Sequence, residues 1–334
     1  MKDDIILQVE NLHTGFLVDN VPLEAVSGVS FSLKAGRVLG VVGESGCGKS
    51  VTAHSIMQLL PKYGRITDGS ITYTRATGEK IEIQKLRRTG NQMRQIRGKE
   101  ISMIFQDPMS SLNPVYPIGD QIAENIREHE KVTKREALDR AQKLLEDLEI
   151  PSAAERLGDY PHQFSGGMKQ RVMIAIAMAC NPRILIADEP TTALDVTIQA
   201  QIIALMKKLQ REHGTSIMMI THNMGLVAEM ADDIAVMYMG RIVEYGSIRQ
   251  VMKSPAHPYT QGLLKAVPVL GMKKDRLYSI KGSTPSLVDR PAGCEFASRC
   301  EYATEACRQV PRAVEVEPGH QVRCWNYKEA TDNG

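Results

Sequence analysis

The pattern of hydrophobic and polar residues changes twice within the first sixty positions. From Ile5 to Leu33 the two kinds alternate, as in antiparallel strands with one buried face. The uninterrupted apolar run Val38 to Val42 predicts a fully buried strand instead. From Val51 to Leu60 the spacing is helical. We therefore expect a strand, a short loop and a helix to follow one another there.

The middle of the chain, between Gln106 and Asn181, has a helical pattern. Its apolar residues recur at intervals of three and four, at Ala137, Leu138, Ala141, Leu144, Leu145 and Leu148. Asp120, Thr133 and Ser152 are the expected helix caps, because their side chains can accept a hydrogen bond from a free backbone N–H.

Strand patterns return after the helical region. Ile184–Ala187 and Ser216–Ile220 are short apolar runs, with a helix expected at Ile198–Arg211 and a hairpin at Met239–Gly240. Together they predict a mixed sheet and an α/β fold. The composition shifts after Gly246, and proline, glycine and cysteine dominate from residue 255 onward. We therefore expect a main domain over residues 1–254 and a C-terminal extension over 255–334.

Composition narrows the classes of protein. A length of 334 residues and a hydrophobic content of 43% suit one large domain with an appendage. The formal net charge of +2 does not indicate nucleic-acid binding. There is no apolar run of about 18 residues and no signal-peptide pattern, so we expect a soluble, cytoplasmic protein that meets a membrane only through a partner. One basic run is interpreted as a solvated face, with nucleotide or lipid contact as the alternative: Lys85, Arg87, Arg88, Arg94, Arg97 and Lys99.

The most specific motif follows the buried strand. It is the segment Gly43-Glu44-Ser45-Gly46-Cys47-Gly48-Lys49-Ser50, which has the spacing of a P-loop and leads into the helix at Val51. Glycines let backbone N–H groups turn toward phosphate oxygens, and the helix N-terminus adds a positive dipole end. Lys49 can reach terminal phosphates, and the Ser50 hydroxyl can ligate Mg²⁺. A simple glycine-rich turn is the alternative, but the full spacing predicts binding of a nucleoside triphosphate.

Two further motifs fit this chemistry. Asp188 and Glu189 stand together at the end of an apolar strand, where the first can hold Mg²⁺ through water and the second can polarise an attacking water. A turn is the alternative for this pair. Ser165-Gly166-Gly167 opens an apolar helix and so creates a second helix end suited to phosphate, or an ordinary serine cap. Two such ends with one P-loop predict a head-to-tail pair of subunits that share the nucleotide.

Taken in order, these motifs resemble the nucleotide-binding subunits of ABC transporters over about residues 5–250. The resemblance implies a P-loop NTPase fold with a RecA-like core, an antiparallel β subdomain and a helical subdomain at about residues 107–182. It identifies Gly43–Ser50 as Walker A, Ile184–Asp188 as Walker B and Ala193-Leu194-Asp195 as the D-loop. Met168 departs from the pattern, because the signature usually has glutamine there.

The resemblance also implies roles for single residues. Gln106 would sense Mg²⁺ and the γ-phosphate and couple to the transmembrane partner. Glu189 would polarise water, His222 would hold the γ-phosphate, and Asp195 would link the two sites of the pair. Phe16 would stack on adenine, with a core phenylalanine as the alternative. The expected nucleotide-binding residues are Phe16, Gly43, Glu44, Ser45, Gly46, Cys47, Gly48, Lys49, Ser50, Val51 and Asp188.

Three segments narrow the resemblance to dipeptide and oligopeptide importer ATPases: Gln106–Pro114, Phe164–Met168 and His257–Leu264. This group implies an ATPase subunit that powers peptide import, peripheral on the cytoplasmic face of the bacterial inner membrane. The implied partners are a second, paralogous ATPase subunit, two permease subunits and an extracytoplasmic peptide-binding protein, and no nucleic acid. The exact cargo is not specified by an ATPase subunit.

Four of the six cysteines lie near the C-terminus, at Cys294, Cys300, Cys307 and Cys324. In the importer group such an extension binds a [4Fe–4S] cluster, which the resemblance therefore implies. Four thiolates also suffice for tetrahedral Zn²⁺, although a short Cys-x-x-Cys pair is missing, and free structural thiols are the third possibility.

Two functions compete at this point. The first is a transport motor, which a complete motif set without a membrane span favours. The second is a soluble ABC ATPase that acts on ribosomes or DNA; such proteins generally carry two cassettes or a coiled-coil insert, and this sequence has neither. Co-purification with two polytopic membrane proteins would support the first, and tight, salt-sensitive binding of RNA or DNA would support the second.

Overall fold

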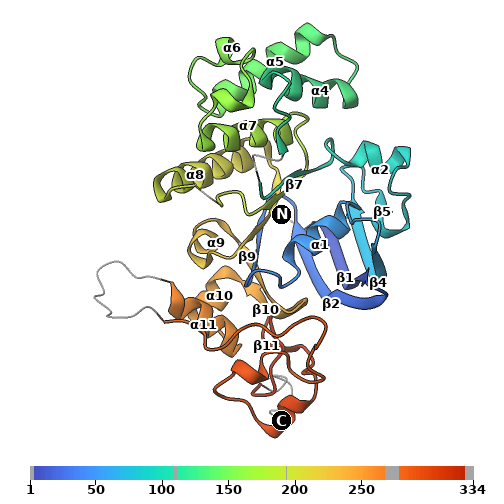
Figure 1. The fold of residues 1–334 in the computed structure, drawn as a ribbon, viewed down its shortest axis with the longest axis vertical. Helices are drawn as coiled ribbons and strands as arrows, with labels where there is room; N and C mark the ends of the chain where they lie inside the picture. Colours follow the sequence, from blue (N-terminus) through green and yellow to red (C-terminus); the bar gives the residue numbers. More distant parts are fainter. Residues whose placement is uncertain (1–3, 108–110, 193, 268–277, 328–334) are drawn as a thin grey trace. The chain divides into compact units, whose positions relative to one another are not determined.

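The computed structural model describes all residues except 1–3, 108–110, 193, 268–277 and 328–334. Figure 1 labels its helices and strands. The chain forms two compact units. The first consists mainly of Lys85–Ile220 together with Lys34–Arg37. The second consists of Ile5–Leu33, Val38–Gln84 and the chain from Thr221 onward. Each unit therefore combines segments that are far apart in the sequence.

An antiparallel sheet occupies the N-terminal part of the second unit. Its order is β2-β1-β4-β5, with the bounds Ile5–Val18 (β1), Val21–Lys34 (β2), Gly64–Thr74 (β4) and Lys80–Glu82 (β5). Asp19 and Asn20 join β1 to β2 with φ angles of 49° and 62°, the left-handed pair of a tight hairpin. The alternating pattern from residue 5 to 33 thus predicted the first two strands, β1 and β2.

Helix α1 (Lys49–Ile56) packs against β1 and β4. It follows β3 (Val38–Val42), whose five residues are all buried, so the predicted order of strand, loop and helix is confirmed. The helix is shorter than expected, because Gln58 takes a positive φ of 53° that ends a right-handed helix.

A second sheet in the same unit has the order β11-β12-β10-β9-β3. β3 runs parallel to β9 (Asp233–Tyr238), and β9 forms a hairpin with β10 (Arg241–Ser247). The turn residues Met239 and Gly240 have positive φ, which confirms the predicted hairpin. The helices of this part are α9 (Met224–Met230), α10 (Ile248–Lys253) and α11 (Pro258–Ala266).

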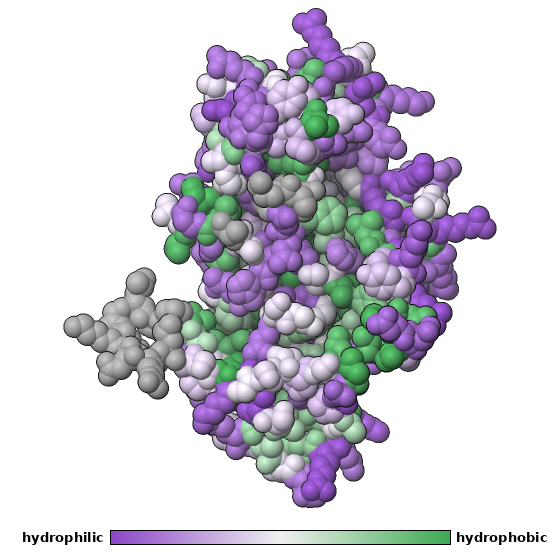
Figure 2. All heavy atoms as spheres, in the orientation of Figure 1, coloured by the Kyte–Doolittle hydropathy of each residue, from purple (hydrophilic) through white to green (hydrophobic). Residues whose placement is uncertain are grey.

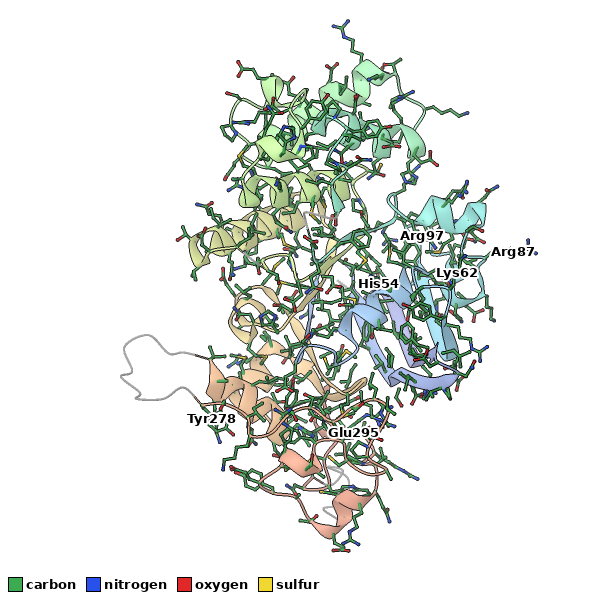
Figure 3. The ribbon with its side chains drawn as sticks, viewed as in Figure 1. His54, Lys62, Arg87, Arg97, Tyr278 and Glu295 are labelled. Atoms are coloured by element: carbon green, nitrogen blue, oxygen red, sulfur yellow. The ribbon has the colours of Figure 1, made fainter. Side chains whose placement is uncertain are left out.

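The C-terminal segment adds two strands to this sheet. β12 (His320–Val322) pairs with β10, and β11 (Val314–Glu317) pairs with β12, while two short 3-10 helices lie at Ala297–Arg299 and Glu305–Arg308. Glu295, which Figure 3 labels in this segment, is 6% exposed and lies 2.7 Å from Arg241 of β10. The shift in composition after Gly246 did not predict this strand pairing.

The first unit contains the parallel strands β6 (Ile101–Ile104), β7 (Ile184–Asp188) and β8 (Ser216–Thr221). Residue Ile104 pairs with Ala187, so Gln106 and Asp188 follow or end neighbouring strands at the same edge. The remaining elements are α2 (Asn91–Ile96), α4 (Ile118–His129), α5 (Lys134–Asp147), α6 (Ala153–Arg156), α7 (Gly166–Met178), α8 (Val196–His213) and the 3-10 turns Ile83–Lys85 and Pro161–Gln163.

The helical pattern of the middle region is confirmed, but only one of its three caps is. Thr133 caps α5 through a reciprocal capping box with Glu136. The prediction for Asp120 was wrong, because it lies in the first turn of α4 and pairs with Lys134 at 2.8 Å. Ser152 stands at the start of α6 in a left-handed conformation and makes no side-chain cap bond.

The visible surface of α4, α5 and α6 is mainly hydrophilic, and hydrophobic side chains appear there singly (Figure 2). The buried residues of α5 are Ala137, Ala141 and Leu145, on the side that contacts α4 and α7. Among the residues that the structure describes, no helix combines the length and apolar character needed to cross a membrane.

Candidate nucleotide site

The P-loop geometry depends on two close approaches of its backbone. A Cβ atom at Gly48 would lie 2.7 Å from the Ala25 carbonyl oxygen, and φ there is 100°. A Cβ atom at Gly43 would lie 2.2 Å from the Met237 carbonyl oxygen. Glycine is therefore required at both positions, and the loop packs tightly against Ala25 of β2 and Met237 of β9. Ser45 and Gly46, at the tip of the loop, are exposed.

Lys49 is held by the loop that it follows. Its side chain is 6% exposed, and Nζ donates to the carbonyl oxygens of Gly43 at 2.7 Å and Glu44 at 3.0 Å. These bonds satisfy a buried ammonium group and keep it beside the loop. Ser50, the first residue after it, is half-buried, as is Val51. Cys47 is buried, and burial raises the pKa of its thiol, so it is a packing residue in the loop.

Phe16 lies at a hollow of the antiparallel sheet rather than in the core. The hollow has a volume of about 430 Å³, and its lining includes Phe16, Tyr63 and Lys62. Of these, Lys62 is labelled in Figure 3. The rings of Phe16 and Tyr63 are 6.0 Å apart, and Tyr63 is 59% exposed. The half-exposed Phe16 therefore has an open face for a flat apolar ligand. No sequence pattern links Tyr63 to Phe16, because 47 positions separate them.

In the first unit, the two acidic residues occupy different environments. Asp188 ends β7 and is 3% exposed, whereas Glu189 is half-buried. Glu189 has a φ of 51°, and its backbone N–H donates to the Ile220 carbonyl at 2.8 Å. The Thr192 hydroxyl donates to Glu189 Oε2 at 2.7 Å and orients the carboxylate. No motif in the sequence indicates this role for Thr192. A left-handed backbone at a non-glycine residue often marks a functional position.

Gln106 and His222 are both exposed. Gln106 follows β6, and its place beside β7 brings it to the strand edge at which Asp188 and Glu189 lie. His222 stands between the end of β8 and α9. The structure therefore groups Gln106, Asp188 and Glu189 in the first unit and the P-loop, Phe16 and His222 in the second.

The signature segment forms a helix end, as predicted. Ser165 caps α7 and accepts a hydrogen bond from the Met168 N–H at 3.3 Å, and both Ser165 and Gly166 are exposed. A Cβ atom at Gly167 would lie 2.9 Å from Ile198 Cγ2, so a glycine is required by the packing of α7 against α8. Asp195 is exposed and caps α8 through the Ile198 N–H at 3.0 Å. Ala193 of the D-loop lies outside the described residues.

Glu44 has partners that the sequence analysis did not find. Arg299 pairs with both of its carboxylate oxygens, at 2.6 and 3.0 Å, and Thr284 donates to one of them at 2.6 Å. Burial alone would raise the pKa of Glu44, but the hydrogen bonds from Arg299 and Thr284 outweigh it and lower the pKa. Tyr259, in the segment His257–Leu264 noted above, accepts the Glu44 N–H at 2.8 Å. The resemblance of that segment to the importer group was the one signal in the sequence that pointed to Tyr259.

The four C-terminal cysteines are free thiols in the structure. The Cys294 N–H donates to the Cys307 carbonyl at 2.9 Å, and this bond holds the backbone at these two cysteines together. Burial raises the pKa of Cys294 to about 11 and also raises the pKa of Cys300 and Cys324, because an isolated buried thiolate is unfavourable. Within the described part of the chain, no three histidine, cysteine or acidic side chains come together as a metal site. The predicted iron–sulfur cluster is thus not supported by the geometry.

Comparison with known proteins agrees with the motifs. Residues 26–192 match the ABC transporter family, and residues 243–307 match the oligopeptide/dipeptide transporter C-terminal region. The dipeptide transport ATP-binding protein DppD of Bacillus subtilis (strain 168) is 48% identical over 96% of this chain and 94% of its own length. The oligopeptide transport ATP-binding protein AppD of the same organism is 48% identical over 97% of each.

A solved structure agrees with the fold. The dimeric bacterial ABC transporter cassette MJ0796 is 26% identical to this chain, with a TM-score of 0.64, and the match covers 73% of this chain and 99% of that one. Fold, motifs and relatives lead to one family. The chain belongs to the ABC transporter family of ATP-binding proteins and carries that family's oligopeptide/dipeptide transporter C-terminal region.

Proposed function

We propose that this chain is the ATP-hydrolysing subunit that powers the import of peptides through a membrane permease. One observation carries the proposal: the similarity to proteins named for dipeptide and oligopeptide transport spans at least 96% of the chain, C-terminal region included. Residues 26–192, which match the ABC transporter family, would supply the energy for transport by hydrolysing ATP. The division into a nucleotide-binding domain over residues 1–254 and an extension over 255–334 is part of this proposal.

The proposed nucleotide roles are those that the family resemblance implies, and the chemistry of the side chains suits them. Lys49 would exchange its two loop carbonyls for phosphate oxygens, and Ser50 would ligate Mg²⁺ together with Gln106. Phe16 would stack on the base in the hollow that it lines. Asp188 would hold the metal ion through water, and His222 would contact the γ-phosphate. Backbone N–H groups from Gly43 to Val51 would surround the phosphates.

Glu189 would polarise the attacking water. Its carboxylate is oriented by Thr192 and is less buried than that of Asp188, so a water molecule can reach it. Glu189→Gln keeps the shape and the hydrogen bond and removes the charge. We expect this variant to bind ATP, to lose nearly all turnover and to stop peptide uptake by the assembled transporter. Wild-type hydrolysis by Glu189→Gln would assign the water to another group.

The exposed helix end at Ser165 supports a head-to-tail pair. Its hydroxyl and the small Gly166 face solvent, so a nucleotide held by the P-loop of a second ATPase subunit can approach them. Asp195, also exposed, would link the two shared sites. A paralogue is the proposed second subunit. ATP-dependent dimerisation in the Glu189→Gln background tests the pair, and hydrolysis at full rate by a monomer, independent of concentration, would contradict it.

A groove in the first unit supports contact with the permease. Its volume is about 750 Å³, and it is lined by α4 and the segment before it. Gln121 holds that segment on α4 by donating to the carbonyls of Asn113 and Tyr116 at 3.0 and 2.9 Å. Val115 and Tyr116, at 72% and 55% exposure, are thus presented on an ordered loop. We propose that a cytoplasmic segment of the permease binds here.

This contact would place the chain at the cytoplasmic face of the inner membrane, with two permease subunits and an extracytoplasmic peptide-binding protein completing the complex. Val115→Ser with Tyr116→Ser should reduce co-purification with the permeases while isolated ATP binding is unchanged. Val288→Ser is the matched control, because Val288 is 64% exposed but lies in the other unit. Salt-sensitive binding to RNA or DNA in place of membrane association would favour the ribosome or DNA function instead.

The cysteine segment is proposed to hold a metal cluster when loaded. Two observations support it. Four cysteines lie between residues 294 and 324, and a backbone hydrogen bond joins Cys294 to Cys307. A bound cation would reverse the pKa shifts, because metal binding requires the thiolate. Iron, sulfide and zinc analysis of anaerobically purified protein distinguishes a [4Fe–4S] cluster from zinc. Protein that contains neither iron nor zinc would show that the four cysteines are free structural thiols.

A further inference from the structure

Glu44, the second residue of the P-loop, has every backbone and side-chain polar group bound within the protein. Its N–H donates to the Tyr259 hydroxyl at 2.8 Å, and its carbonyl accepts from Lys49 Nζ at 3.0 Å. Its carboxylate accepts from Arg299 and Thr284. Three of these four contacts therefore come from α11 or the segment beyond it, between 215 and 255 positions away in the chain.

Arg299 is built into this contact rather than resting on the surface. Its side chain is only 5% exposed, its guanidinium forms the two-pronged pair with Glu44, and its Nε donates to the Lys281 carbonyl at 3.0 Å. The guanidinium lies over the rings of Tyr238 and Phe296, at 5.8 and 5.9 Å from their centroids. A planar guanidinium held by these three hydrogen bonds and two rings has one orientation, which a lysine would not keep.

The same rings hold Tyr259. Its ring centroid is 4.8 Å from that of Tyr238 and 5.4 Å from that of Phe296. Tyr259 is fully buried, and burial raises the pKa of its phenol, so the hydroxyl stays protonated beside the P-loop. One aromatic cluster thus positions two groups that bind Glu44. These are the Tyr259 hydroxyl, which accepts the Glu44 N–H, and the Arg299 guanidinium, which pairs with the Glu44 carboxylate.

We propose that Arg299 is a positioning residue for the P-loop, through which the cysteine-bearing C-terminal segment sets the loop's ATP affinity. Arg299 directly precedes Cys300 and ends the 3-10 helix that begins three residues after Cys294. Any change that moves this short helix also moves the guanidinium. The inference rests on the proposed assignment of ATP to the P-loop.

Charge explains why the loss of Arg299 should weaken ATP binding. An unpaired Glu44 carboxylate would stand in a loop that has to accept a polyanion, and Coulomb repulsion would oppose the phosphates. The carboxylate would also compete for Lys49, whose Nζ already lies against the Glu44 carbonyl. Paired with Arg299, the Glu44 carboxylate has its charge balanced within the protein.

The test is titration of the full-length protein with a fluorescent ATP analogue. We expect Arg299→Ala to weaken binding about tenfold, and Arg299→Ala with Glu44→Gln to recover most of that loss, because the second change removes the unpaired charge. Arg299→Lys should fall between, since it keeps the charge without the paired geometry. Arg308→Ala is the matched control in the same segment, because Arg308 pairs only at the surface with Glu305, at 80% and 81% exposure.

The outcomes separate this inference from the site assignment. If Lys49→Ala binds the analogue normally, the P-loop assignment itself fails. If Lys49→Ala loses binding while Arg299→Ala keeps wild-type affinity, only the role of Arg299 is refuted. An equal loss in the single and double variants would also refute the charge argument. Should Arg299→Ala not fold, Arg299→Lys and Thr284→Val, which removes one donor to Glu44, decide in its place by weakened or unchanged binding.

Discussion

The junction between β10 and α11 should make the stability of this protein depend on pH through one histidine. His257 caps α11, and its Nδ1 accepts the Tyr259 N–H at 3.0 Å, which requires an unprotonated nitrogen. The side chain is 1% exposed. Burial lowers the pKa of His257 from 6.5 to about 4, and the nearby Glu244 carboxylate opposes this shift only in part.

The sign and size follow from linkage. The unfolded chain binds a proton near pH 6.5 and the folded chain only near pH 4, so stability is full above 6.5 and falls as the pH drops through that interval. At about 1.4 kcal/mol per pH unit, the loss attributable to His257 is about 1 kcal/mol at pH of about 5.5 and about 2 to 3 kcal/mol at pH of about 4.5. Below the folded pKa the loss becomes constant.

The assay compares the wild type with His257→Asn in denaturant unfolding across this range. Asparagine can cap α11 with its side-chain oxygen but does not titrate. The pH dependence contributed by all other titrating groups therefore cancels in the difference between the two proteins. The wild type should lose about 2 to 3 kcal/mol more than the variant between neutral pH and about 4.5. Parallel pH curves for the two proteins would refute the reasoning, and so would a wild type that becomes relatively more stable in acid.

The remaining predictions concern the nucleotide site and one cap. Lys49→Ala should lose most ATP affinity in a binding titration, since no other described side chain of the P-loop carries a positive charge to the phosphates. Phe16→Ala should weaken ATP and GTP alike by roughly tenfold, because stacking is worth about 1 to 3 kcal/mol per base whatever the base; an unchanged affinity would make Phe16 a packing residue. Thr133→Ala should lower the free energy of unfolding by about 1 kcal/mol with ATP binding unaltered, whereas Thr133→Asn, which keeps the cap, should not.

Local sequence determined the elements whose causes lie within a few residues. The P-loop spacing, the buried run of β3, the helix cap at Thr133 and the hairpin at Met239–Gly240 each depend on neighbours in the chain, and each was predicted. The order of the motifs was also sufficient to indicate the family. Asp120 failed as a cap because a residue suited to capping does not by itself decide where the helix begins.

Tertiary structure alone decided which distant segments meet. β12 pairs with β10 beside the buried Glu244. The Glu244 carboxylate lies 2.8 Å from His320 Nε2 and accepts the N–H groups of Ala256 and His257, an arrangement that no local pattern encodes. Arg299 reaches Glu44 across 255 positions of chain. Hydrophobic periodicity and capping report short-range preferences, whereas a buried ion pair forms only where the complete fold excludes water and brings its two halves together.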